Sequence, residues 1–325
     1  MSPHVAHEVL AEIARVPLTE ALLPEDAVRL SEQLIAEVGG QGSLYAEDVR
    51  TGVALGLRPD EPTVTASVFK IAVLLELHRQ AASGELDLTE RVRVGGAMRV
   101  FGPTGLSCFS DDAEMSLRDL AVMMISVSDN TATDAVLRRV GLDRVNGTLC
   151  GLGHVGTRLA GDCAQLLTGL LTDLALGPGD DPGTMTVAPD RLLAIRALTP
   201  AQTSRTTARE MTALLVQIWK DTAAPAQACA QVRHVLSLQA WAHGLRAGTD
   251  PGMSFAGKSG ALPGVRNEAG VLTSPAGDQV ALAVFLRFRT DRLIEQRPDV
   301  DQVIAALGRL AVRGVRQKAV APERP

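Results

Sequence analysis

Residues 62–82 read PTVTASVFKIAVLLELHRQAA, and this stretch decides how the chain is organised. It begins with an extended segment over Pro62–Thr65, and a helix is predicted from about Ser67 to Ala82. Apolar residues fall on nearly every face of this helix, which predicts burial on nearly every side. Ser67 lies at the N-terminus, where backbone N–H groups point outward, and Lys70 follows one turn later on the same face.

This pair of residues has the chemistry of a nucleophile and its base. A serine hydroxyl is a poor nucleophile until a base takes its proton, and a desolvated lysine can be that base because burial lowers its pKa. The segment alone also fits an N-cap serine beside a lysine that reaches out of a core helix. The chain otherwise uses arginine, and its only lysines are Lys70, Lys220, Lys258 and Lys318. This bias favours a role that requires a lysine to lose its proton.

A second polar motif lies between two predicted helices. Ser116 opens the first helix, with Asp119 three residues later as in a capping box. The motif Ser128-Asp129-Asn130 interrupts the apolar pattern, and a new helix begins near Thr131. A short connection of this kind can present Ser128 and Asn130 to a cleft, although the same residues are ordinary in turns.

A third motif, Lys258-Ser259-Gly260, lies in a segment predicted to be a strand. Gly260 leaves room for another backbone to approach, as a substrate pairing along an edge strand requires. Lys258 offers a positive charge to a substrate carboxylate. The tripeptide is common by chance, so its weight comes from its order and spacing relative to the other two motifs.

The pattern of elements predicts an α+β fold with three layers, α/β/α. Strands are predicted at both ends of the chain, and the middle is mostly helical, apart from a loop expected at 177–189. The predicted strands are 43–48, 53–57, 254–260, 267–273 and 279–288, flanked by helices at 24–38 and 300–315. We therefore expect one antiparallel sheet assembled from both chain ends, with an inserted helical lobe. The expected sheet lobe is 1–65 with 240–325, the helical lobe is 66–239, and the two form one integrated catalytic domain.

In order and context, the three motifs resemble those of the serine β-lactamase and penicillin-binding protein superfamily, closest to the class A β-lactamases. The resemblance covers residues 43–315. It implies a catalytic group of Ser67, Lys70, Ser128 and Lys258, in which Ser67 is acylated, Lys70 deprotonates it and Ser128 relays a proton to the leaving group. It also implies a substrate-binding group of Asn130, Ser259, Gly260, Ala261 and Arg266. Within this group Asn130 would hold an amide, and Lys258 and Ser259 would bind a carboxylate. The N–H groups of Ser67 and Ala261 would form an oxyanion hole. Arg266 is a candidate second carboxylate anchor because it follows the third motif closely.

The sequence departs from class A in one respect. Class A enzymes carry a Glu-x-x-Leu-Asn loop whose glutamate activates the water that releases the acyl group. The one glutamate between Asn130 and Lys258 is Glu210, which lies in a predicted helix; Asp162 is a possible substitute. We therefore expect a serine hydrolase that forms an acyl-enzyme on an amide, ester or β-lactam carbonyl, with weak or absent β-lactamase turnover. The alternatives are an intracellular acyltransferase or biosynthetic tailoring enzyme, and a catalytically silent ligand-binding domain.

Charge and composition limit the kinds of molecule that this protein is expected to bind. The net charge of −5 gives no basic surface for nucleic acid, and no apolar run is long enough to span a membrane. The first residues lack a signal-peptide pattern, so a cytoplasmic location is expected. The four cysteines have no C-x-x-C spacing and are expected to be free thiols, and neither a metal nor another cofactor is expected. The expected partner is a small-molecule substrate bearing a carboxylate, with a monomer as the default state.

Overall fold

The computed structural model describes residues 3–177, 180 and 184–316. The helices are α1 (Pro3–Arg15), α2 (Pro24–Glu37), α3 (Lys70–Ala82), α4 (Leu117–Ser126), α5 (Asn130–Val140), α6 (Leu142–Gly151), α7 (Cys163–Asp173), α8 (Pro189–Leu193), α9 (Ala208–Trp219), α10 (Ala226–Ser237) and α11 (Pro298–Val315). The strands are β1 (Gly40–Asp48), β2 (Ala54–Leu57), β3 (Thr63–Val64), β4 (Arg91–Val94), β5 (Ala113–Ser116), β6 (Arg205–Thr206), β7 (Ser254–Leu262), β8 (Val265–Thr273) and β9 (Gln279–Phe288).

The central sheet has the strand order β2-β1-β9-β8-β7, and every neighbouring pair is antiparallel. The first two strands come from the beginning of the chain and the other three from its end. Strand β1 pairs with β9 from Gly40 opposite Phe288 to Asp48 opposite Val280. The prediction of one antiparallel sheet built from both chain ends is therefore confirmed.

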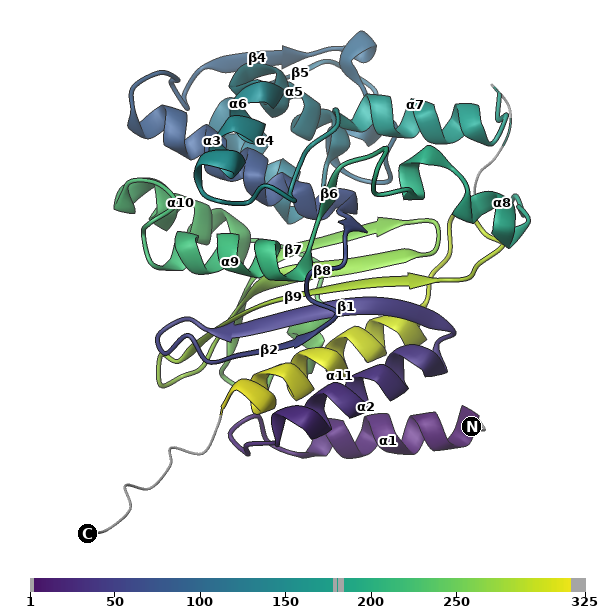
Figure 1. The fold of residues 1–325 in the computed structure, drawn as a ribbon. Helices are drawn as coiled ribbons and strands as arrows, with labels where there is room; N and C mark the ends of the chain where they lie inside the picture. The colour runs from purple at the N-terminus through teal and green to yellow at the C-terminus, as the bar shows by residue number, and fades with distance from the viewer. Residues whose placement is uncertain (1–2, 178–179, 181–183, 317–325) are drawn as a thin grey trace.

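Helices cover both faces of this sheet (Figure 1). On one face α11 packs against α1, α2 and β1, and on the other α9 packs against β1 and β9 while α10 packs against β7. Strand β9 is buried along almost its whole length, as expected for a central strand covered on both faces. The three-layer α/β/α prediction is confirmed.

The helix predicted at 67–82 forms the core of the helical lobe, where it contacts α4, α5, α6 and α10. Its first turn differs from the prediction. Residues Ala66–Phe69 form a short 3-10 turn, η1, and the α-helix begins at Lys70. The tighter turn packs η1 against the sheet edge at β7, and a contact between segments so far apart in the sequence leaves no trace in the helical periodicity.

Other differences are local. Asn130 is the first residue of α5 and Asp129 its N-cap, one position earlier than predicted. Of the loop expected at 177–189, residues 178, 179 and 181–183 lie outside the described part of the chain, as do 317–325. Within the described residues, none of the helices has the length and apolar character needed to cross a membrane.

Candidate active site

The segment that carries Ser67 is held in an unusual backbone conformation. Ala66 has φ = 44°, a left-handed value that costs a residue with a Cβ free energy. Its φ lets the chain turn from β3 into η1, so that Ser67 is half-buried between the buried side chains of Ala66 and Val68. Such strain is typical of functional sites, where surrounding contacts hold it in place.

Lys70 joins the first two motifs. Its Nζ donates to the Ser128 carbonyl at 2.9 Å and lies 3.2 Å from Ser128 Oγ, and it also donates to Asn130 Oδ1 at 3.0 Å. The side chain is fully buried, and this desolvation lowers the pKa of Lys70 below its usual range. A larger fraction of such a lysine is neutral near pH 7 than of a lysine in water, and only the neutral amine can accept a proton.

The side-chain carboxylate of Asp129 fixes the Ser128-Asp129-Asn130 turn in place. This buried carboxylate accepts the N–H of Leu106 at 2.6 Å and of Ala132 at 3.0 Å. Ser128 itself has φ = 59°, a second strained position in the site. Asn130 uses its amide twice, because Nδ2 donates to the Phe101 carbonyl at 3.0 Å while Oδ1 accepts from Lys70. The turn therefore holds Ser128 and Asn130 at Lys70, half-buried and not sealed in the core.

Lys258 projects from β7, the edge strand of the sheet. It is fully buried, and its Nζ donates to the carbonyl of Ser259 at 2.7 Å. Burial, and then the neighbouring charge of Lys70, lower the pKa of Lys258 well below its usual range. The two motif lysines are therefore close enough to influence each other's protonation.

The edge of β7 presents backbone groups to the site. The Ser259 N–H donates to the side chain of Gln239 at 2.6 Å, and so points away from β8. Outward N–H groups alternate along an antiparallel edge, so that of Ala261, two residues on, points the same way. Gly260 between them lies against η1, and a Cβ added there would be 2.8 Å from the Ser67 nitrogen. The N–H groups of Ser67 and Ala261 thus lie on neighbouring segments that touch at Gly260.

Sequence reasoning missed two residues behind this edge. The buried carboxylate of Glu268 accepts the N–H of Leu245 at 2.7 Å and the amide of Gln239 at 3.3 Å. Gln239 in turn accepts from Ser259, so the two side chains form a chain of hydrogen bonds to the third motif. Burial raises the pKa of Glu268 to about 7. The available signal was a glutamate inside an otherwise apolar strand, a residue rarely buried without partners.

Two of the candidate site residues, Arg266 and Asp162, make hydrogen bonds elsewhere. Arg266 donates through its guanidinium to the carbonyls of Val265 and Glu295, so its role as a carboxylate anchor stays a prediction. Asp162 is the N-cap of α7, where its carboxylate accepts the Gln165 N–H at 2.8 Å. Its expected role as a substitute for the missing glutamate gains no support from this contact.

The start of α7 lies beside Lys70 and supplies a thiol there. Asp134 is buried and accepts the N–H groups of Cys163 and Ala164 at 2.8 and 2.9 Å. Burial raises the pKa of Cys163 to about 12, and the charge of Lys70 is the largest influence in the opposite direction. Both buried carboxylates whose charge acts on Lys70, Asp129 and Asp134, are thus used to hold backbone N–H groups.

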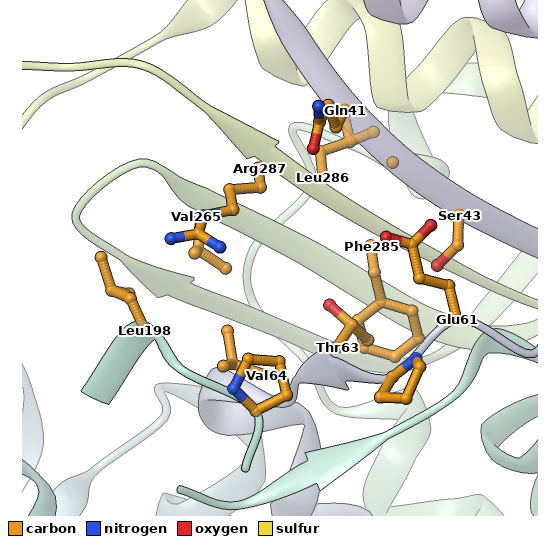
Figure 2. A pocket seen from close by; sticks show the side chains of 13 residues that line it. Gln41, Ser43, Glu61, Thr63, Val64, Leu198, Val265, Phe285, Leu286 and Arg287 are labelled. Atoms are coloured by element: carbon orange, nitrogen blue, oxygen red, sulfur yellow. The ribbon is translucent and has the colours of Figure 1, made fainter. Parts of the chain in front are cut away.

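A separate hollow of about 80 Å³ lies behind the strand that leads to Ser67 (Figure 2). Arg287 extends beside Val265 and Leu198, and its Nη2 donates to the Leu193 carbonyl at 3.0 Å. Its lining contains no residue of the three motifs. In the described part of the chain, no group of three His, Cys, Asp or Glu side chains is arranged to hold a metal ion.

Comparison with known proteins gives one family. The model of the beta-lactamase enzyme family matches residues 27–315. A curated relative, the beta-lactamase regulatory protein BlaB of Streptomyces cacaoi, is 26% identical over 305 residues, covering 88% of this chain and 96% of that protein.

Solved structures share the fold. The beta-lactamase of Sphaerobacter thermophilus superimposes with a TM-score of 0.71 at 24% identity, covering 90% of this chain and 96% of that one. The class A beta-lactamase of Mycobacterium abscessus gives 0.70 at 19% identity, covering 88% and 98%. The protein PBP-A gives 0.68 at 18% identity, covering 87% and 94%, and a PBP-A variant has been solved as an acyl-enzyme complex with penicillin G.

Proposed function

Because this chain belongs to the beta-lactamase enzyme family, we propose that it is a serine hydrolase that forms an acyl-enzyme on Ser67. The observation that carries the proposal is the environment of Lys70. This lysine is buried, has a lowered pKa, lies one turn from Ser67 and contacts Ser128 and Asn130. Buried lysines in such contacts act as bases toward a neighbouring hydroxyl.

The proposed reaction uses each motif in turn. Ser67 Oγ attacks the carbonyl carbon of an ester, amide or β-lactam, and its proton passes to Lys70. Lys70 returns a proton through Ser128 to the leaving group as the scissile bond breaks. The N–H groups of Ser67 and Ala261 stabilise the oxyanion. Lys258 and Ser259 bind a carboxylate of the substrate.

Release of the acyl group is proposed to be the slow step with β-lactams. Asp129 and Asp134 are occupied by backbone N–H groups, and Asp162 caps α7. A water molecule at the acyl carbon therefore has no carboxylate of this set free to activate it. This supports weak β-lactamase turnover.

A second candidate function is ligand sensing without turnover. The observation that favours it is the relative from Streptomyces cacaoi, which is described as a regulatory protein. A sensor would keep the pocket and acylate once, or bind without reacting.

Intact-protein mass spectrometry tests these proposals. The protein is mixed with a penicillin and, separately, with an activated ester, and wild type is compared with Ser67→Ala. Ser83→Ala is the matched control, since that exposed hydroxyl at the end of α3 bonds only local groups. A stable penicillin adduct on wild type and Ser83→Ala, absent from Ser67→Ala, is expected.

The remaining outcomes separate the candidates. Ester turnover that needs Ser67 supports the hydrolase, and turnover only with an added amine supports an acyltransferase. An adduct with neither kind of turnover supports the sensor. Rapid penicillin hydrolysis without an adduct would contradict the weak release step, and the absence of both adduct and product would contradict the acyl-enzyme itself.

A further inference from the structure

A hollow of about 320 Å³ adjoins the candidate active site. Four segments converge on it: the loop at 101–103, helix α7, the β7–β8 hairpin, and residues 288–295 after β9. Asn130 and Ala261, both in the candidate active site, form part of its lining. The volume lies in the range of roughly 300–1,000 Å³ typical of small-molecule sites.

The walls of this hollow are apolar. Its lining includes Phe101, Leu167, Leu170, Leu171, Leu262, Pro263, Phe288, Leu293 and Ile294. Three of these side chains are left in contact with water, with exposed fractions of 63% for Phe101, 37% for Leu171 and 56% for Ile294. Exposed apolar side chains gathered around one concave site mark a place where a ligand binds.

The guanidinium of Arg266 and the amide of Asn130, two polar groups of the lining, already make hydrogen bonds. The guanidinium of Arg266 donates to the carbonyls of Val265 and Glu295. The amide of Asn130 bonds Lys70 and the Phe101 carbonyl. The partly exposed guanidinium of Arg292 lies 3.9 Å from the carboxylate of its chain neighbour Asp291. The hollow thus offers more apolar surface than unpaired charge.

The direction from Ser67 identifies the occupant. Along the chain, Lys258 and Ser259 precede Ala261 and are absent from the lining of the hollow, whereas Leu262 and Pro263 follow Ala261 and belong to it. In the proposed reaction Ser128 serves the leaving group and Lys258 the carboxylate, so the hollow lies on the other side of Ala261, where the acyl group extends. We infer that this hollow binds the acyl side of the substrate and that the acyl group is apolar, a medium-length alkyl chain or an aryl group. The inference rests on the proposed acylation of Ser67. The chemical step is unchanged: the Ser67 Oγ–acyl bond forms, the bond to the leaving group breaks, and the leaving group takes the proton.

A series of 4-nitrophenyl esters tests the inference. The acetate, butyrate, hexanoate and octanoate are compared by kcat/KM, together with the hemisuccinate, which carries a charge on the acyl side. We expect kcat/KM to rise about two- to fourfold per methylene as the chain fills the hollow. A flat series, or a preference for hemisuccinate over butyrate, overturns the inference.

A pair of leucine variants locates the effect. Leu171→Gln introduces an amide into the wall of the hollow, and we expect it to lower the octanoate-to-acetate ratio of kcat/KM about tenfold. Leu23→Gln is the matched control, because Leu23 is also an exposed leucine but lies at the start of α2, on the opposite side of the sheet. Equal ratios in the two variants place the acyl chain elsewhere and overturn the assignment.

A binding measurement separates this inference from the proposed function. Ser67→Ala cannot be acylated on Ser67, so calorimetric titration with N-octanoylglycine and N-acetylglycine tests the hollow alone. We expect the octanoyl compound to bind at least tenfold more tightly, and Leu171→Gln to reduce the difference. Equal affinities overturn the inference even where ester turnover by the wild type upholds the hydrolase. Tighter octanoyl binding upholds the inference even where ester turnover is absent.

Discussion

Two lysines share the interior of this protein at the candidate active site. Lys70 and Lys258 are both fully buried, and the charge of Lys70 favours the neutral form of Lys258. Burying an unpaired ammonium is costly, so such groups lose their protons or acquire partners. The acidic side chains that act on them are Asp129 and Asp134 for Lys70 and Glu268 for Lys258. The protonation of Glu268 therefore belongs to the same coupled set as the motif lysines.

The raised pKa of Glu268 predicts that the stability of the fold depends on pH. Burial raises the pKa of Glu268 from 4.5 to about 7, with Lys258 opposing that rise and Asp301 adding to it. Between pH 4.5 and 7 the folded state therefore keeps the Glu268 proton, while the unfolded state has already lost it. As pH rises through this range, the contribution of Glu268 to the free energy of unfolding falls. The loss is about 3 kcal/mol by the linkage relation. Glu268→Gln removes it, so the variant should gain stability relative to wild type between pH 4.5 and 7.5.

Urea unfolding at several pH values measures this difference. The m-values of the two proteins should agree, so that the midpoints report stability alone. Lys258 and Asp301 are the charged side chains that act on Glu268, and Glu268→Gln also removes its influence on them, so the difference between the two proteins reports Glu268 together with these neighbours. Parallel stability curves for the two proteins would show that Glu268 ionises normally in the folded state.

At the scale of elements, the contact between β7 and η1 fixes the geometry of the candidate active site around Ser67. Gly260 has no side chain where the two segments meet, and a Cβ would lie 2.8 Å from the Ser67 nitrogen and 3.0 Å from the Thr65 carbonyl oxygen. Gly260→Ala must therefore move the edge strand away from Ser67. We expect acylation to slow about 10–100-fold, because displacements of this kind spoil the alignment of reacting groups. Stopped-flow acylation by a chromogenic ester measures the rate.

The matched control is Gly147→Ala. Gly147 lies inside α6 with no atom within 4 Å of an added Cβ. This variant should acylate at the wild-type rate and gain about 0.5–1 kcal/mol of stability, since alanine favours helix more than glycine does. Wild-type acylation by Gly260→Ala would mean that the close approach of β7 is not needed for the reaction.

Much of the element pattern could be predicted from the sequence. Two strand-like apolar segments joined by turn residues located β8 and β9 to within two residues, and the capping box located α4, where Ser116 accepts the Asp119 N–H. The motifs identified Lys70, Ser128 and Asn130, which the structure brings into contact. The 3-10 turn at Ser67 and the Gln239–Glu268 chain could not be predicted, because they depend on contacts between segments far apart in the sequence.

At the scale of the whole molecule, Arg309 connects the beginning of the chain to its end. This buried side chain on α11 donates to the carbonyls of Ile13, Val16 and Gly248, and to Asp250 at 2.8 Å. Arg309→Met leaves these acceptors without a donor, and we expect a loss of about 3–5 kcal/mol in the free energy of unfolding. Chemical denaturation measures it.

An exposed pair of equal length provides the control. Arg29 lies 2.8 Å from Asp26 on α2, but its side chain is 57% exposed, compared with 7% for Arg309. Arg29→Met should change stability by no more than about 1 kcal/mol, because exposed ion pairs contribute little. Similar losses in the two variants would show that burial is not what gives the Arg309 contacts their strength.

The pairing of β1 with β9 also constrains how the chain folds during translation. During synthesis on the ribosome β1 emerges long before its partner at Gln279–Phe288, because the whole helical lobe is translated between them. Until then β1 can pair with β2 alone, and its other edge stays open to strands of other nascent chains. The helical lobe, by contrast, is translated without interruption between the two. The nascent chain must therefore keep an open strand edge from aggregating while the residues between β1 and β9 are translated.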